Sequence, residues 1–149
     1  MNFTVKRLNS GEVDLAKQLF LFFQEDDQIS QPVIPSDSYL EEMLSKGDFH
    51  VIVAIHDGNL IGGLTGYELP MYKRPIREMF LYEISVNPEF RQLGVAKVLI
   101  EMLKEISVEK GVEEMYVGTS TRNKAAMALY ASTGGEQEAD IAWFIYQCR

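Results

Sequence analysis

Residues 82–97, YEISVNPEFRQLGVAK, combine residue types that could bind an anion. An apolar run ends in a short polar turn, and Gly94 stands directly before a run with helical periodicity. Amides in the first turn of a helix lack partners within the helix and lie at the positive end of its dipole, so they can bind a phosphate. Arg91 adds a positive charge beside that turn. A turn with a purely structural role stays an alternative, because neither a Walker loop nor the Gly-x-Gly-x-x-Gly pattern is present.

Glu83 is an acid inside an otherwise apolar run, MFLYEISV. An unpaired buried carboxylate is costly, so Glu83 is expected to line a cleft or to pair with a cation. In a cleft it could accept a proton from an ammonium group, whose pKa is about 10. A solvent-facing strand position is the alternative. Glu68 and Glu78 could extend an acidic site or be ordinary surface charges, and no chemistry is expected of His50 and His56.

Hydrophobic periodicity predicts the elements that must position these residues. The expected strands cover residues 3–8, 49–55, 60–69, 78–86, 112–118 and 141–147, and the expected helices cover residues 12–24, 38–46, 94–110 and 123–132. Ser10 is expected to cap the first helix, while Gly47 and Gly111 are expected stop signals. This order predicts an α/β fold in which helices pack on a mixed sheet.

Length and composition limit the class of protein. The chain has 149 residues, of which 46% are hydrophobic, so one compact domain over residues 1–149 is expected. No apolar run approaches the roughly 20 residues of a membrane helix, and the first residues lack the apolar core of a signal peptide. The single cysteine, Cys148, and two histidines do not make a zinc site. The expectation is a cytoplasmic protein without a metal and without a membrane partner.

The charge balance bears on partners. Fourteen Lys and Arg against 22 Asp and Glu leave a formal net charge of −8. Such a surface repels phosphate backbones, so nucleic-acid binding is not expected, and a cationic substrate is favoured. The alternative is that the acidity only serves solubility.

The motifs together resemble the GNAT superfamily, the Gcn5-related N-acetyltransferases. Arg91-Gln92-Leu93-Gly94-Val95-Ala96 matches the superfamily pattern Arg/Gln-x-x-Gly-x-Gly/Ala, and the preceding strand ends in Val-Asn-Pro. Residues 123–130, followed by Gly134-Gly135, are similar to the second cofactor segment. The resemblance implies a mostly antiparallel central sheet, splayed at the cofactor site and flanked by about four helices.

A narrower resemblance concerns the aminoglycoside 3-N-acetyltransferase group. It is carried by residues 67–70, YELP, by Arg74-Pro75 and by residues 82–86, YEISV. That group has Asp where this chain has Glu83, which keeps the carboxylate but lengthens it by one methylene.

The resemblance implies direct acetyl transfer from acetyl-CoA to a primary amine of a small cationic substrate, such as an aminoglycoside, without a metal. Glu83 would be the general base and Tyr130 the general acid for the leaving thiolate, although Tyr130 could instead only pack in its helix. The implied cofactor-binding residues are Ile84, Ser85 and Val86 along the pantetheine arm, Arg91 near the adenine-side phosphates, Gln92, Leu93, Gly94, Val95, Ala96 and Lys97 around the pyrophosphate, and Asn123 near the pantetheine.

Three points stay open at this stage. The same chemistry could act on a peptide or protein amine, or the chain could be a non-catalytic acyl-CoA sensor. A homodimer is common in the superfamily, and the apolar last expected strand could support one.

Overall fold

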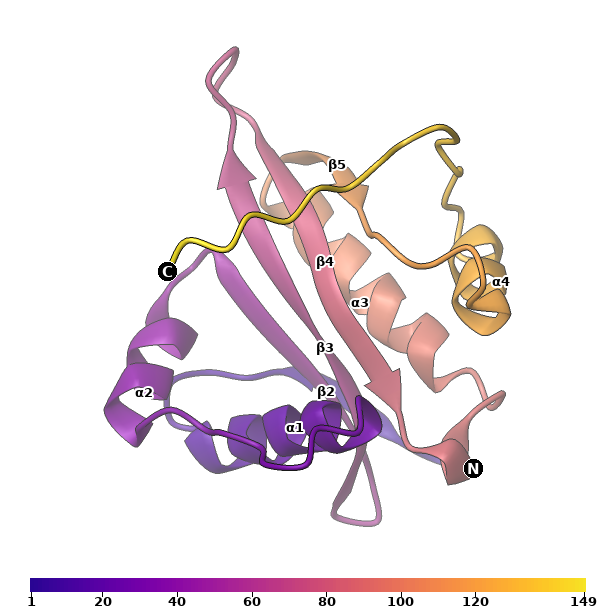
Figure 1. Cartoon of the computed structure of the whole chain (residues 1–149). Helices are drawn as coiled ribbons and strands as arrows, with labels where there is room; N and C mark the ends of the chain where they lie inside the picture. Colours follow the sequence, from indigo (N-terminus) through magenta and orange to yellow (C-terminus); the bar gives the residue numbers. More distant parts are fainter. The chain divides into compact units, whose positions relative to one another are not determined.

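The computed structural model describes all of residues 1–149, which form two compact units, residues 1–118 and residues 119–149. The first unit is built on one sheet in the order β1-β2-β3-β4-β5 (Figure 1). Its strands are β1 (Thr4–Arg7), β2 (Phe49–His56), β3 (Asn59–Pro70), β4 (Arg77–Val86) and β5 (Val112–Tyr116). The first four pair antiparallel, and β5 joins β4 in parallel. The predicted mixed, mostly antiparallel sheet is therefore confirmed.

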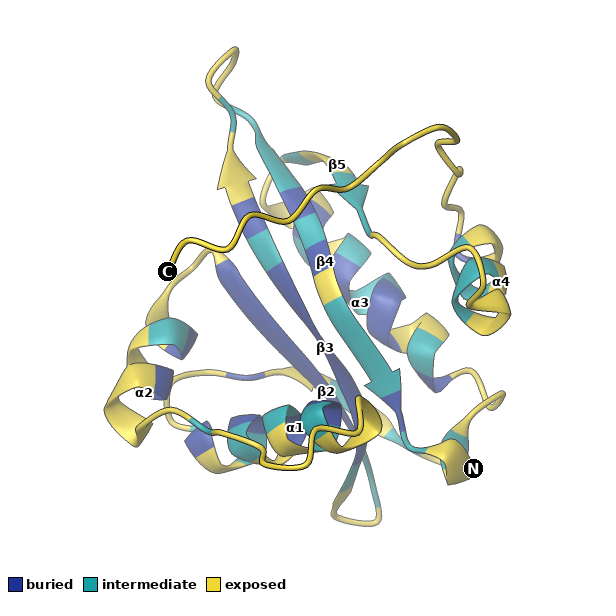
Figure 2. Ribbon diagram, viewed as in Figure 1, coloured by how far each residue is buried: buried dark blue, intermediate teal, exposed yellow.

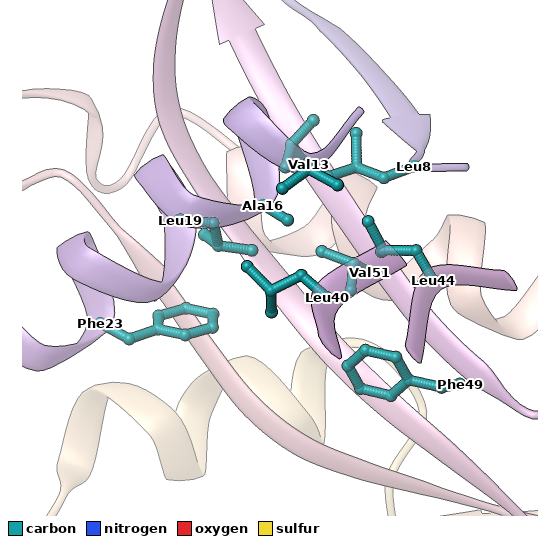
Figure 3. Packing of buried hydrophobic residues seen from close by; sticks show 10 residues of the cluster. Leu8, Val13, Ala16, Leu19, Phe23, Leu40, Leu44, Phe49 and Val51 are labelled. Atoms are coloured by element: carbon teal, nitrogen blue, oxygen red, sulfur yellow. The ribbon is translucent and has the colours of Figure 1, made fainter. Parts of the chain in front are cut away.

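Helices cover both faces of this sheet. They are α1 (Val13–Asp26), α2 (Asp37–Ser45) and α3 (Val95–Glu109), with a short 3-10 turn, η1 (Pro88–Phe90), before α3. Leu19 of α1, Leu40 of α2 and Val51 of β2 share one buried cluster, and their side chains point toward one another (Figure 3). On the opposite face, α3 packs closely against the sheet. A Cβ added at Gly66 of β3 would lie only 3.3 Å from the side chain of Leu103 in α3.

The middle of the sheet is buried because its strands are apolar on both faces. Residues 51–54 of β2 are all at most 1% exposed, and Figure 2 shows β2 and β3 as the buried centre. Gly63 lets α1 approach β3, since a Cβ there would lie 2.7 Å from Leu19 Cδ1 and 2.6 Å from the Ile52 carbonyl oxygen. Asp57 and Gly58 have φ of 48° and 78°, which suits the two-residue turn between β2 and β3.

The expected cap of the first helix is wrong. Helix α1 begins at Val13 after Glu12, and no side chain caps it through a hydrogen bond. Glu12 is already engaged, because it accepts a hydrogen bond from the Asn9 amide and pairs with Lys6. Helix α2, in contrast, has Ser36 as its N-cap, which accepts a hydrogen bond from the Tyr39 amide at 3.3 Å. The other ends differ from the expected ones by a few residues.

The predicted last strand, residues 141–147, is also wrong. The second unit contains one helix, α4 (Lys124–Ser132), and no strand follows it. The apolar side chains from Trp143 to Tyr146 are each more than 70% exposed. The run has the composition of a strand, but a strand exists only where another strand accepts its backbone hydrogen bonds.

Two expectations stay predictions: a single domain across residues 1–149, and a homodimer. No helix combines the length and the apolar character needed to cross a membrane.

Candidate active site

The junction between β4 and α3 (residues 91–97, hereafter the β4–α3 junction) presents free backbone amides. Helix α3 starts at Val95, and its first hydrogen bond runs from the Val98 amide to the Gly94 carbonyl, at 3.1 Å. The amides of Val95, Ala96 and Lys97 therefore have no partner within the helix. Glycine is needed at position 94 because its φ is +85°, while a Cβ there would meet nothing within 4 Å. The geometry is that of an anion-binding helix start.

The edge of β4 next to this junction is open. Strand β4 pairs with β3 as far as Val86, but it pairs with β5 only over residues 77–80. From Ile84 to Val86, β4 therefore has no neighbouring strand on its β5 side, and there the Val86 carbonyl accepts a hydrogen bond from Arg91 Nε. The sheet is open at this place, as the resemblance to the GNAT superfamily implies. An extended ligand with amide groups could form hydrogen bonds along this edge.

Arg91, the first residue of the β4–α3 junction, is held in place by two hydrogen bonds. Its Nε donates to the Val86 carbonyl at 2.8 Å, and its Nη2 donates to Asp26 Oδ1 at 3.0 Å. Asp26 is the last residue of α1, and its Oδ2 also accepts a hydrogen bond from Ser85 Oγ at 2.5 Å. Sequence reasoning missed Asp26, because these contacts join residues about 60 positions apart, beyond the reach of any local pattern.

A pocket of about 330 Å³ lies between the sheet face and the segment that contains α1 and α2. It is called the Glu83 pocket here. Two of its lining residues, Glu83 and Asp27, are acidic, and much of the rest is aromatic or aliphatic. Its aromatic wall is continuous, with ring centroids 4.9 Å apart for Phe49 and Tyr67 and 5.7 Å apart for Tyr67 and Tyr82. A cation with an apolar face fits such surroundings.

A bulge in β4 directs Glu83 into this pocket. Thr65 of β3 faces Glu83 and the next residue, Gly66, faces Leu81, so Tyr82 is an extra residue in β4. Consecutive strand residues normally point to opposite faces, but Tyr82 and Glu83 both line the pocket. The sequence indicated that Glu83 lies in an apolar strand, and the register shift decides which face its carboxylate reaches.

The carboxylate of Glu83 has the environment of a proton acceptor near neutral pH. Burial, the Asp27 carboxylate with which it shares a hydrogen bond, and the nearby charge of Asp26 together raise the pKa of Glu83 to about 7. The sequence predicts that Glu83 either lines a cleft or pairs with a cation. No cation pairs with its carboxylate, and it lines the pocket. Perturbed carboxylates in a pocket are typical of functional sites.

The second unit holds the other two expected site residues, Asn123 just before α4 and Tyr130 within it. Asn123 caps this helix, because its Oδ1 accepts a hydrogen bond from the Ala126 amide at 3.1 Å. Tyr130 lies in the last turns of α4, and partial burial raises the pKa of its phenol. The Gly135 amide donates to the Tyr130 carbonyl at 2.8 Å, and a Cβ at Gly135 would lie 2.9 Å from that oxygen. Gly134 has a φ of +97°, so both glycines suit the chain turn that ends α4.

Glu68 does not extend the acidic site. Its side chain is completely buried, 2.5 Å from His50 Nε2, 3.1 Å from Lys110 Nζ and 3.5 Å from Arg77 Nη1. Burial opposes ionisation of Glu68, but hydrogen bonds from His50 and Lys110 outweigh it and hold the pKa of that carboxyl below its usual range. His50, whose pKa burial lowers, is its neutral partner. The cluster ties the end of α3 to β2 and β3.

No three His, Cys, Asp or Glu side chains gather into a group that could hold a metal ion. The expectation that the chain uses no metal stays a prediction.

Comparison with known proteins gives a consistent result. The acetyltransferase (GNAT) family matches residues 16–134. An aminoglycoside N(6′)-acetyltransferase type 1 of Salmonella typhimurium is 30% identical over 125 residues, 78% of this chain and 85% of that protein. The crystal structure of the aminoglycoside acetyltransferase meta-AAC0020 from an uncultured soil metagenomic sample, in complex with sisomicin, matches with a TM-score of 0.92 at 26% identity over 99% of this chain and 97% of that chain. AAC(6′)-Iy, in complex with the bisubstrate analogue CoA-S-monomethyl-acetylneamine, matches with a TM-score of 0.79 at 25% identity over 99% and 100% of the two chains.

This chain therefore belongs to the acetyltransferase (GNAT) family, and it is an N-acetyltransferase. The superfamily and the similarity to aminoglycoside acetyltransferases, both expected from the sequence, are confirmed. The Salmonella relative and AAC(6′)-Iy are named as 6′-N enzymes, so the 3-N group stays a prediction.

Proposed function

We propose that this protein transfers the acetyl group of acetyl-CoA directly to a primary amine of an aminoglycoside or a similar small polycationic amine. One observation carries the proposal most: Glu83 and Asp27 face a pocket whose other walls are largely aromatic and aliphatic. An amino sugar has charged ammonium groups and apolar ring faces, and this pocket complements both. The names of the relatives and the net charge of −8 support the same substrate class.

The residues of this chain fit acetyl-CoA. The free amides of the β4–α3 junction, residues 92–97, would hold the pyrophosphate, and Arg91 would lie near the phosphates. The open edge at Ile84, Ser85 and Val86 would bind the pantetheine arm, with Asn123 near it. Acetyl-CoA would supply the thioester carbonyl that the amine attacks.

Glu83 is proposed as the general base. A pKa of about 7 leaves this carboxylate partly deprotonated near neutral pH, which is where a base accepts protons most effectively. Its deprotonated form also attracts the incoming ammonium, so binding and deprotonation use the same group. Asp27, in the same pocket wall, would bind a further ammonium group of a polycation.

Tyr130 is proposed as the general acid. Its phenol, whose pKa burial raises, carries a proton at neutral pH that it would donate to the departing thiolate. This role requires residues 1–118 and 119–149 to form one catalytic domain, which is part of the proposal. Tyr130→Phe should lower kcat about tenfold or more while CoA affinity, measured by calorimetry, stays unchanged. An undiminished kcat would remove Tyr130 as the acid.

The test is CoA release, followed with a thiol reagent, for the purified protein with acetyl-CoA and each of sisomicin, spermidine and a lysine peptide. Turnover with sisomicin, and a loss of about a hundredfold or more in Glu83→Gln, is the expected result. Glu105→Gln is the matched control, since Glu105 is exposed on α3. Turnover only with the peptide would move the substrate to protein amines. CoA binding without turnover on any amine would make the chain an acyl-CoA sensor.

A further inference from the structure

Asp26 touches both halves of the proposed site. It ends α1, its Oδ1 accepts a hydrogen bond from Arg91 at the β4–α3 junction, and its Oδ2 accepts one from Ser85 of β4. Its neighbour Asp27 lines the Glu83 pocket. One carboxylate thus connects the anion-binding junction with the wall of the acidic pocket.

Arg91 has charge and donors to offer an anion. Its Nε is fixed by the Val86 carbonyl, which keeps the guanidinium at the junction, and its side chain is 49% exposed. An arginine has five N–H donors, and the recorded bonds use only Nε and one at Nη2. A phosphate bound by the amides of Val95, Ala96 and Lys97 would compete with Asp26 for this guanidinium, because phosphate carries more charge than a carboxylate.

The charge of Asp26 also acts on the other half of the proposed site, the Glu83 pocket. Its negative charge is one of the causes that raise the pKa of Glu83, so the two carboxylates interact electrostatically. While Asp26 is paired with Arg91, part of that negative charge is neutralised. Loss of the pair would therefore make the surroundings of Glu83 and Asp27 more negative.

We propose that Asp26 is a positioning residue shared by the two half-sites: binding of the donor's phosphates draws Arg91 away from Asp26, and the released carboxylate strengthens binding of the cationic acceptor. The inference rests on the proposed function. It predicts that each substrate raises the affinity of the protein for the other by the same factor. An exposed ion pair limits this factor to roughly two- to fivefold.

The experiment has two arms, both by calorimetry with CoA, which cannot react. The first arm compares CoA binding to wild type, Asp26→Asn and Asp27→Asn. Both variants lose one negative charge, but only Asp26 pairs with Arg91. We expect Asp26→Asn to bind CoA roughly two- to fivefold more tightly than Asp27→Asn does. In the background of Arg91→Ala, Asp26→Asn should change CoA affinity no more than Asp27→Asn does.

The second arm measures sisomicin binding with and without saturating CoA. Wild type should bind sisomicin more tightly in the presence of CoA, and Asp26→Asn should lose this gain. Ser85→Ala, which removes the other partner of Asp26 without changing charge, should keep it. Coupling that persists in Asp26→Asn, or is absent from wild type, would overturn the inference.

Failure of the proposed function would look different from failure of this inference. If sisomicin does not bind at all, the substrate class is wrong, and the CoA arm still decides about the Arg91–Asp26 pair. Equal CoA affinities in Asp26→Asn and Asp27→Asn would overturn the proposal that the phosphates draw Arg91 away from Asp26, whichever amine is the acceptor. Thermal melts of each variant establish that it is folded.

Discussion

Glu83 and Asp27 come from a strand and from the residue after a helix, and they meet in the wall of one pocket. Neither residue alone has unusual chemistry. Burial, and after it the proximity of Asp27, moves the pKa of Glu83 from the range of an ordinary carboxyl to about 7. At the scale of residues, the proposed catalysis depends on burial and on this neighbour.

Asp27→Asn should shift the acidic limb of the pH profile of kcat/KM to lower pH. The base works when deprotonated, so activity rises as pH passes its pKa, and removing a neighbouring negative charge lowers that pKa. The shift should be about one unit or less, because burial, the largest cause of the raised pKa, remains. The measurement is kcat/KM for sisomicin from pH 5 to 9. An unchanged limb would show that another group is the base, and Glu25→Gln serves as the charge control.

At the scale of elements, the start of α3 depends on one backbone conformation. Gly94 and Gly111, at the two ends of this helix, have φ of +85° and +70°, and neither has a neighbour within 4 Å of a Cβ position. Both positions require the same left-handed backbone conformation, but only Gly94 borders the free amides of the β4–α3 junction. This pair allows backbone strain to be separated from ligand binding.

Gly94→Ala and Gly111→Ala should each lower the free energy of unfolding by about 1 kcal/mol, since left-handed backbone is unfavourable for alanine. Only Gly94→Ala should also weaken CoA binding, because its methyl group would stand where the phosphate approaches. Urea denaturation and calorimetry measure the two effects. Equal CoA affinity in both variants would contradict the assignment of this junction to the pyrophosphate.

The cluster around Glu68 is a second feature of this scale, because it joins α3 to β2 and β3. Glu68→Gln should lower the free energy of unfolding by roughly 3 kcal/mol, the low end for breaking a buried ion pair, since Lys110 and Arg77 reach solvent. Wild-type stability should fall as pH drops below about 6.5, because the unfolded chain then protonates His50, which burial keeps neutral in the fold. The contribution of the Glu68 carboxylate is lost at lower pH still, as its own depressed pKa is passed. Denaturation curves between pH 2 and 8 would test both statements, and a flat profile for wild type would contradict them.

At the scale of the whole molecule, the net charge of −8 acts over distances longer than any contact. Long-range attraction between exposed charges is screened by salt, with a Debye length of about 10 Å at 0.1 M. KM for sisomicin should therefore rise when ionic strength increases from 0.05 to 0.5 M, and KM for a monoamine should rise less. Steady-state kinetics at both salt concentrations measure this. Equal changes for the two amines would show that the acidic surface does not contribute to substrate choice.

The sequence by itself determined the features that depend on neighbours along the chain. The apolar runs of β2 and β3, the helical stripe of α3 and the glycine before it are local patterns, and each predicts its element correctly. The family motif lies in the same short segment, so the superfamily could be inferred without the fold. Strand 141–147 was predicted wrongly for the same reason, because local composition does not supply a pairing partner.

Only the tertiary structure decided the site's electrostatics. Asp26 reaches Ser85 and Arg91 across 59 and 65 residues, and His50 reaches Glu68 across 18. The bulge at Tyr82 that turns Glu83 into its pocket is a register shift between two strands, which no single strand's sequence contains. The pKa of a carboxyl depends on charges within a few ångströms in space, and folding brings those charges together from distant positions.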